Sequence, residues 1–231
     1  MNKWQPEMIA IDLDGTLVDS VPDLHAAVVQ MQRVLAVSGE TKDQTVSTAA
    51  DVRSWVGNGI ERLVHRSLTN TTHDDAPAEL FTKGLREFRK AYQLTNGQHS
   101  SVYPNVITTL KHLQEKNIPL CCVTNKSREF SLSLLSMHSL SGFFPLVIAG
   151  DDVGQKKPHP EALIKAASHF DVEPSACLMV GDSTADMQAA QTANFRFTAV
   201  SYGYNHGVSM HDVEQNLYAV IDDFSELLNF K

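Results

Sequence analysis

The sequence has few cysteines, no excess of basic residues and no long apolar run. Its three cysteines among 231 residues lack the spacing of a metal site, which predicts reduced structural thiols in a cytoplasmic protein. The formal net charge of -8 at pH 7 argues against a nucleic-acid partner, because such proteins normally carry a basic surface. No apolar run is long enough to span a bilayer, and no secretory signal is recognisable, so we expect no membrane partner.

The composition that remains is that of an ordinary globular protein. Hydrophobic residues make up 42% of the chain and charged residues 20%. A chain of 231 residues is long enough for one large domain or two smaller ones. The distribution of apolar residues along the chain therefore has to indicate which of these domain organisations is present.

Residues 20–97 show helical apolar spacing without an interrupting strand pattern. One helical face recurs at intervals of three and four residues, at Val21, Leu24, Val28, Met31 and Leu35. Ser20 and Asp23 predict a capping box at the start of this helix. Two more helices are expected, one after the Gly57–Gly59 turn and one over about residues 78–92. The segment is predicted to be an inserted helical cap domain.

The remaining residues, 1–19 and 98–231, alternate short apolar runs with helical patterns. Strands are expected at residues 8–11, 120–123, 146–149, 178–180 and 197–200. Alternating strands and helices favour a parallel sheet with right-handed crossovers. The predicted fold class is α/β, a doubly wound parallel sheet with a Rossmann-like core.

Polar residues follow the ends of the expected strands. Asp12 and Asp14 follow the first, Thr124 and Asn125 the second, Lys156 and Lys157 come after the third, and Asp182 and Asp186 follow the fourth. A parallel sheet brings these ends to one edge, where open α/β sheets bind ligands. Close carboxylates suit a hard cation such as Mg²⁺, and an ammonium group suits an anionic substrate.

These residues carry a resemblance to a known family. The relevant segments are DLDGTLVDS (12–20), VRSWVGNG (52–59), VTNK (123–126), GDDVGQKKPHP (150–160) and YGYN (202–205). In this order they resemble the haloacid dehalogenase superfamily and, within it, the phosphoglycolate phosphatase family. The resemblance spans the whole chain, and the helical insert matches the cap of that family. It implies hydrolysis of 2-phosphoglycolate to glycolate and phosphate with Mg²⁺ as cofactor.

The resemblance also implies a role for each residue at the strand ends. Asp12 would be the nucleophile that forms an aspartyl-phosphate, and Asp14 would protonate the leaving oxygen and later activate water. Mg²⁺ would be held by Asp12, the backbone carbonyl of Asp14, and Asp182. Thr124 and Asn125 would bind phosphoryl oxygens, and Lys157 would stabilise the phosphoryl group.

The cap and one acidic residue leave open questions. Arg53 is a candidate for binding the substrate carboxylate when the cap closes, and the alternative is a solvated arginine on a helix. Asp186 would hold a metal-bound water or a neighbouring side chain. A phosphatase or phosphomutase for another small ester, such as a sugar phosphate or pyrophosphate, remains an alternative, as does a non-catalytic sensor of phosphorylated metabolites. The sequence leaves the oligomeric state open.

Overall fold

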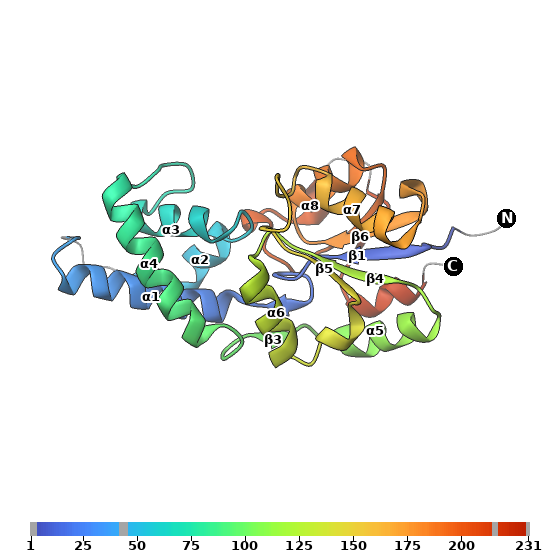
Figure 1. The fold of residues 1–231 in the computed structure, drawn as a ribbon, viewed down its shortest axis with the longest axis horizontal. Helices are drawn as coiled ribbons and strands as arrows, with labels where there is room; N and C mark the ends of the chain where they lie inside the picture. The colour runs from blue at the N-terminus through green and yellow to red at the C-terminus, as the bar shows by residue number, and fades with distance from the viewer. Residues whose placement is uncertain (1–3, 42–45, 214–216, 230–231) are drawn as a thin grey trace.

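A six-stranded sheet forms the centre of the protein in the computed structural model, which describes residues 4–41, 46–213 and 217–229 (Figure 1). The strand order is β5-β4-β1-β6-β7-β8, and every neighbouring pair runs parallel. The strands are β1 (Met8–Ile11), β4 (Leu120–Val123), β5 (Leu146–Ile148), β6 (Cys177–Gly181), β7 (Arg196–Val200) and β8 (Ala219–Ile221). This arrangement confirms the predicted doubly wound α/β fold.

Helices cover both faces of this sheet. In Figure 1, α7 (Glu161–Phe170) and α8 (Thr184–Thr192) lie on one face, and α5 (Val106–Glu115) and α6 (Arg128–Met137) lie on the other. Short 3-10 helices occupy the connections, at Ser141–Phe143, Pro174–Ala176, Asn205–Gly207, Met210–Asp212 and Phe224–Asn229. None of the helices in the described part of the chain is long and apolar enough to cross a membrane.

Strand β1 shows why the central strands are apolar throughout. Its side chains alternate between the two faces, so Ile9 and Ile11 join one hydrophobic cluster while Met8 and Ala10 join the other. Because helices cover both faces, all four side chains are buried. The chain leaving β1 is therefore fixed on both sides, which positions the residues that follow it.

Four helices pack together between β2 (Val18–Asp19) and β3 (Ser101–Val102), which form a small antiparallel pair. They are α1 (Val21–Val37), α2 (Ala49–Trp55), α3 (Ile60–Thr69) and α4 (Ala78–Thr95). Their shared apolar cluster includes the expected face of α1, and they lie at one end of the molecule, away from the sheet (Figure 1). The apolar spacing gives no sign of helix α2, which begins instead with a capping box formed by Thr48 and Asp51.

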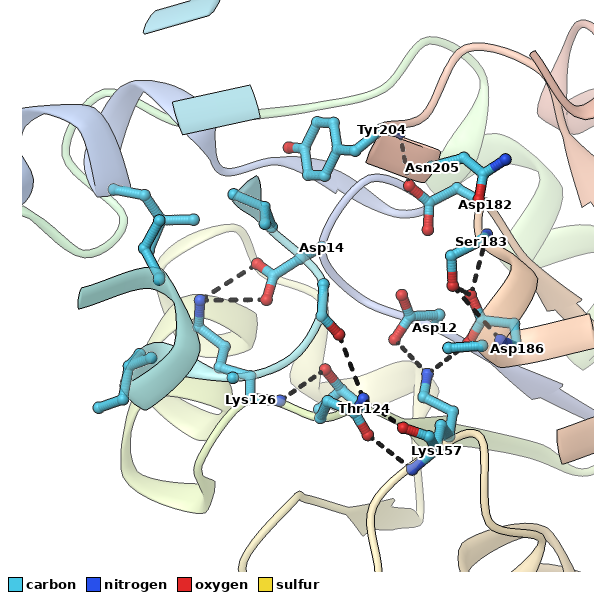
Figure 2. Close-up of a pocket in the computed structure, with 18 residues that line it drawn as sticks. Asp12, Asp14, Thr124, Lys126, Lys157, Asp182, Ser183, Asp186, Tyr204 and Asn205 are labelled. Atoms are coloured by element: carbon cyan, nitrogen blue, oxygen red, sulfur yellow. Dashed lines mark hydrogen bonds and ion pairs between the residues drawn. The ribbon is translucent and has the colours of Figure 1, made fainter. Parts of the chain in front are cut away.

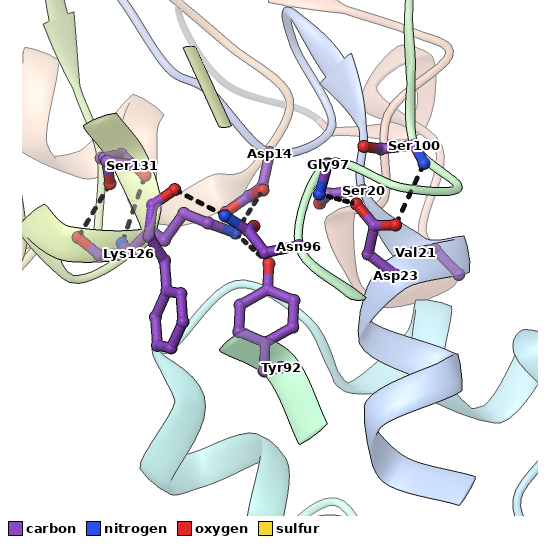
Figure 3. Close-up of polar contacts among 12 residues, drawn as sticks. Asp14, Ser20, Val21, Asp23, Tyr92, Asn96, Gly97, Ser100, Lys126 and Ser131 are labelled. Atoms are coloured by element: carbon purple, nitrogen blue, oxygen red, sulfur yellow. Dashed lines mark hydrogen bonds and ion pairs between the residues drawn. The ribbon is translucent and has the colours of Figure 1, made fainter. Parts of the chain in front are cut away.

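The predicted capping box of α1 is wrong. The Ser20 side chain makes no capping bond, and its backbone N–H donates to the Tyr204 hydroxyl at 2.8 Å. The buried Asp23 carboxylate instead accepts backbone N–H groups from the segment between α4 and β3 (Figure 3). The donors are Gly97 at 2.7 Å, His99 at 2.6 Å and Ser100 at 3.2 Å. Asp23 therefore fastens the second crossing between the helices and the sheet, a tertiary role that spacing within α1 does not reveal.

Replacing Asp23 with Asn should destabilise the protein. The amide would direct an N–H donor at backbone N–H donors and would remove the charge that strengthens these bonds. We expect a loss of about 1.5–3 kcal/mol in the free energy of unfolding, measured by urea denaturation. The exposed Asp74 provides the matched control, because Asp74→Asn should change this free energy by less than about 0.5 kcal/mol. Equal midpoints for both variants would show that Asp23 does not fasten the crossing.

Candidate active site

The polar residues predicted from the strand ends, except Lys156, meet in one pocket (Figure 2). Its sheet side contains Asp12, Asp14, Thr124, Asn125, Lys126, Lys157, Asp182 and Asp186. Its other side is formed by residues from the four-helix region and its turn, namely Leu24, Val56, Gly57, Gly59, Ile60 and Leu63. The pocket thus joins a charged wall from the sheet edge to an apolar wall from the helices.

Lys157 lies between two carboxylates on the charged wall. Its Nζ atom is 2.7 Å from Asp12 Oδ1 and 2.6 Å from Asp186 Oδ1, and it donates to the Val123 carbonyl at 2.8 Å. Only 3% of the Lys157 side chain is exposed. The ammonium group therefore lies among three oxygen atoms of the protein, two of them from carboxylates. Lys156, in contrast, is exposed, and its Nζ atom lies 3.7 Å from Glu61 Oε2.

Three buried carboxylates face one another beside Lys157. One oxygen each of Asp12, Asp182 and Asp186 lies within 4.8 Å of the other two. Burial is the main cause that raises the pKa of Asp12 to about 7. Attraction to the Lys157 ammonium lowers this pKa only in part, and repulsion from the Asp186 carboxylate raises it further. Burial, followed by repulsion from Asp186 and Asp12, also raises the pKa of Asp182 well above its usual range.

The charge balance of this wall fits a divalent cation. Among the described residues that line the pocket there are four carboxylates, of Asp12, Asp14, Asp182 and Asp186, and two ammonium groups, of Lys126 and Lys157. With every group ionised, the formal charge is −2 before a ligand binds. A divalent cation that prefers oxygen ligands would neutralise this negative charge and would offset the free-energy cost of burying the carboxylates.

Asp186 is held rigidly at the start of helix α8. Its Oδ2 atom accepts from the Ser183 backbone at 3.1 Å and from the Ser183 hydroxyl at 2.6 Å, while its own N–H donates back to that hydroxyl at 3.3 Å. This capping box aims Oδ1 at Lys157. The structure shows the contact with a neighbouring side chain, and a metal-bound water at Asp186 stays a prediction.

Asp14 points away from this cluster, toward a second lysine (Figure 2). Lys126 Nζ donates to Asp14 Oδ1 at 3.1 Å and Oδ2 at 3.3 Å, and also to the Tyr92 hydroxyl from helix α4. Burial disfavours the ammonium form, but Asp14 and Tyr92 outweigh it and raise the pKa of Lys126. Lys126 therefore remains a cation within the pocket, although the sequence reasoning assigned it no role.

Thr124 and Asn125 are both in the pocket, but their side chains differ in availability. The Thr124 hydroxyl accepts the Lys126 backbone N–H at 3.2 Å, and a hydroxyl keeps its donor for a ligand. Both N–H groups of the Asn125 amide are engaged, with the carbonyls of Gly57 at 3.2 Å and Lys157 at 2.9 Å. Phosphoryl binding by the Asn125 side chain would require one of these bonds to break.

Arg53 lies outside the lining of the pocket. Its Nη2 atom is 3.0 Å from Asp19 Oδ2, its guanidinium lies 4.9 Å from the centre of the Tyr204 ring, and 40% of its side chain is exposed. The structure therefore does not bring Arg53 together with the other candidate residues, and its contact with a substrate carboxylate stays a prediction. The nearby Trp55 is buried in the helical cluster.

A different arginine shapes the turn that lines the pocket. The buried Arg66 donates to the Trp55 carbonyl, to Asn58 Oδ1 at 3.0 Å and to the Thr72 carbonyl at 3.1 Å. These bonds span the Gly57–Gly59 turn from helix α3 and fix its position. Nothing in the local sequence distinguishes Arg66 from an ordinary helix-surface arginine, so sequence reasoning missed it.

Asp182 is held by a close approach of two glycines and a tyrosine. The Tyr204 backbone N–H donates to Asp182 Oδ2 at 2.6 Å, and the Tyr204 hydroxyl donates to Asp19 Oδ1 at 2.8 Å. A Cβ atom at Gly15 or at Gly203 would collide with the Asp182 side chain, and Gly15 also has φ +88°. The segment YGYN thus matters because it encloses one carboxylate and reaches the helix crossing, a role its sequence alone does not show.

A comparison with protein families identifies this arrangement. A family model described as haloacid dehalogenase-like hydrolase matches residues 9–200. The chain belongs to this family. The match includes the pocket residues Asp12, Thr124, Lys157 and Asp182, together with the four helices α1 to α4.

Individual relatives narrow the family further. The chain is 43% identical over 227 residues to a phosphoglycolate phosphatase of Nitrosococcus oceani, covering 97% of this chain and 96% of that protein. It is 37% identical to a phosphoglycolate phosphatase of Vibrio vulnificus, covering 99% and 97%. This haloacid dehalogenase-like hydrolase is therefore a member of the phosphoglycolate phosphatase family, whose enzymes hydrolyse phosphoric monoesters.

A solved structure is similar over nearly the whole chain. The crystal structure of a predicted phosphoglycolate phosphatase from Haemophilus somnus has a TM-score of 0.85 at 27% sequence identity, and the match covers 96% of each chain. The family, together with the acidic cluster, supports a divalent metal in this hydrolase. Both resemblances predicted from the sequence, to the superfamily and to the phosphatase family, are confirmed.

Substituting Gly203 with Ala should weaken binding of a divalent metal. The added methyl group would collide with Asp182, so this carboxylate would have to leave its present position. Changes to groups that orient metal ligands typically cost about 10- to 100-fold in affinity, and we expect that range in a Mg²⁺ titration by calorimetry.

Gly142→Ala provides a matched control. A Cβ atom at Gly142 meets nothing within 4 Å, so this variant should bind Mg²⁺ as the wild type does. Unchanged affinity in Gly203→Ala, with a folded protein by circular dichroism, would show that Asp182 is not needed to hold the metal.

Proposed function

We propose that this protein hydrolyses 2-phosphoglycolate to glycolate and phosphate through an aspartyl-phosphate on Asp12. The observation that carries the proposal is the Asp12 carboxylate, buried at the end of β1 and held at 2.7 Å by Lys157 in the pocket. The 43% identity to a phosphoglycolate phosphatase supports the choice of substrate. Membership of the phosphatase family supports a small phosphate ester as the substrate class.

We further propose Mg²⁺ as the divalent metal. Asp12, the backbone carbonyl of Asp14, and Asp182 would hold it, and it would supply positive charge beside the phosphoryl oxygens. The oxygen donors at this edge and their excess of negative charge support a hard cation.

The proposed reaction has two steps. The Asp12 carboxylate attacks phosphorus, the ester P–O bond breaks, and Asp14 gives its proton to the departing oxygen of glycolate. A water molecule then loses a proton to Asp14 and attacks the same phosphorus, which releases phosphate and restores Asp12. Lys157 and the Thr124 hydroxyl would hold the phosphoryl oxygens during both steps.

The division into domains and the location of the protein are part of the proposal. Residues 20–97 would act as a cap over the core formed by residues 1–19 and 98–231, consistent with the apolar wall that the helices add to the pocket. All three cysteines are buried free thiols, which supports a reducing compartment and hence a cytoplasmic location.

A panel of phosphate esters tests the substrate. With saturating Mg²⁺, 2-phosphoglycolate should have a higher kcat/KM than sugar phosphates, pyrophosphate or p-nitrophenyl phosphate, and chelation of the metal should abolish turnover. A sugar phosphate hydrolysed far more efficiently than 2-phosphoglycolate would favour the alternative phosphatases. No hydrolysis of any ester would favour the sensor.

Substituting Asp12 with Asn tests the nucleophile. The amide does not attack phosphorus and carries no charge to the metal, so kcat should fall by about 10² or more while the fold is retained. Asp212→Asn, at an exposed position, should keep full activity. A beryllofluoride complex of the wild type should form on Asp12, and a complex on any other carboxylate would assign the nucleophile elsewhere.

A further inference from the structure

The pocket contains two lysines whose hydrogen bonding differs. Lys157 Nζ contacts three separate groups, the carboxylates of Asp12 and Asp186 and the carbonyl of Val123. Among the described residues, Lys126 Nζ contacts only two groups: it donates to Asp14 Oδ1 at 3.1 Å, to Asp14 Oδ2 at 3.3 Å and to the Tyr92 hydroxyl. Two of these three bonds go to the same carboxylate, so the longer one, to Asp14 Oδ2 at 3.3 Å, can pass to a ligand oxygen while Asp14 stays bound through Oδ1.

Lys126 is also built into the pocket and held firmly there. Only 3% of its side chain is exposed, and its backbone is fixed by Thr124 at 3.2 Å and by Gly150 at 2.8 Å. The Tyr92 ring that holds the ammonium is fully buried and packs on Phe130, with ring centres 4.6 Å apart. A group fixed in this way loses little conformational entropy when it binds a ligand.

The two lysines lie on different sides of the pocket. In Figure 2, Lys157 reaches Asp12 and Asp186, whereas Lys126 reaches Asp14 on the side where Tyr92 of helix α4 approaches (Figure 3). Lys157 is therefore beside the proposed nucleophile and Lys126 beside the proposed acid for the leaving group. A substrate with one anion at each end matches this separation of charge.

The helical wall of the pocket supplies no competing cation. Its described lining residues are apolar or glycine, and Arg53 is turned toward Asp19 at 3.0 Å instead. Among the described residues that line the pocket, a carboxylate on the leaving group would therefore find one ammonium group besides Lys157, that of Lys126. Its charge-assisted hydrogen bond would be about twice as strong as one to a neutral hydroxyl.

We propose that Lys126 exchanges its longer bond to Asp14 for the carboxylate of 2-phosphoglycolate, and of the glycolate product, and so selects substrates whose leaving group is an anion. This inference rests on the proposed function. Lys126, which follows strand β4, would then recognise the leaving group, and Tyr92 of helix α4 would hold Lys126 in place.

The test compares 2-phosphoglycolate with 2-hydroxyethyl phosphate, in which a hydroxymethyl group replaces the carboxylate. The measured quantity is the ratio of the two kcat/KM values, because damage to Asp14 or to the fold lowers both values alike. Lys126→Met should lower this ratio by about 10- to 150-fold, and Lys126→Arg should restore part of it. Arg53→Met tests the other candidate for the carboxylate, and Lys111→Met, at an exposed position outside the pocket, is the matched control and should leave the ratio within about threefold of the wild type.

Two results would overturn the proposal. An unchanged ratio in Lys126→Met would mean that Lys126 only supports Asp14, and a lowered ratio in Arg53→Met alone would make Arg53 the carboxylate receptor. If the wild type does not hydrolyse 2-phosphoglycolate, the proposed function itself fails, which the wild-type rates show before any variant is made.

A crystal structure of the wild type with bound product tests the same assignment and does not depend on the folding of a variant. Crystals grown with glycolate, Mg²⁺ and beryllofluoride should place a glycolate carboxylate oxygen about 3 Å from Lys126 Nζ. A carboxylate bound to Arg53, or to the backbone of the Gly57–Gly59 turn, would refute the assignment even where Lys126→Met is unstable.

Discussion

The burial of Asp12, Asp182 and Asp186 against one another is the constraint on which the rest of the site depends. Removing a carboxylate from water is costly, and placing a second carboxylate beside it adds repulsion. Both effects act here and raise the pKa values of Asp12 and Asp182. Such a cluster persists only when the surrounding structure holds it, which Lys157 does by charge and the α8 capping box does by hydrogen bonds.

The same constraint extends to the junction with the helices. Tyr204 bonds Asp182 through its backbone and Asp19 and Ser20 through its hydroxyl, so one residue touches both the acidic cluster and the crossing into α1. Asp23 fastens the return crossing by three backbone hydrogen bonds. The position of the helical region is therefore tied to the position of a carboxylate in the reaction centre.

The sequence predicts the parts of this design that depend on local patterns. The alternation of short apolar runs with helical patterns indicates the parallel sheet, and the polar residues after each strand indicate its active edge, because parallel strands bring their ends together. The contacts it does not predict join residues far apart in the chain. Lys126 meets Asp14 across 112 positions and Tyr204 meets Asp19 across 185. The spacing of Ser20 and Asp23 was misleading for the same reason. The Asp23 carboxylate accepts backbone N–H groups of residues 97–100 and not the backbone N–H of Ser20.

Electrostatics also determine the order in which the metal ion and the substrate are expected to bind. The protein carries a formal charge of −8, so its overall field repels an anionic ester, and the pocket itself has two more carboxylates than ammonium groups. A dianionic phosphate therefore meets a repulsive edge until a divalent cation neutralises that excess. Within a buried site this repulsion is screened little by salt. For this reason we expect the cation to bind first and the ester second, with Lys157 and Lys126 then determining how the ester lies.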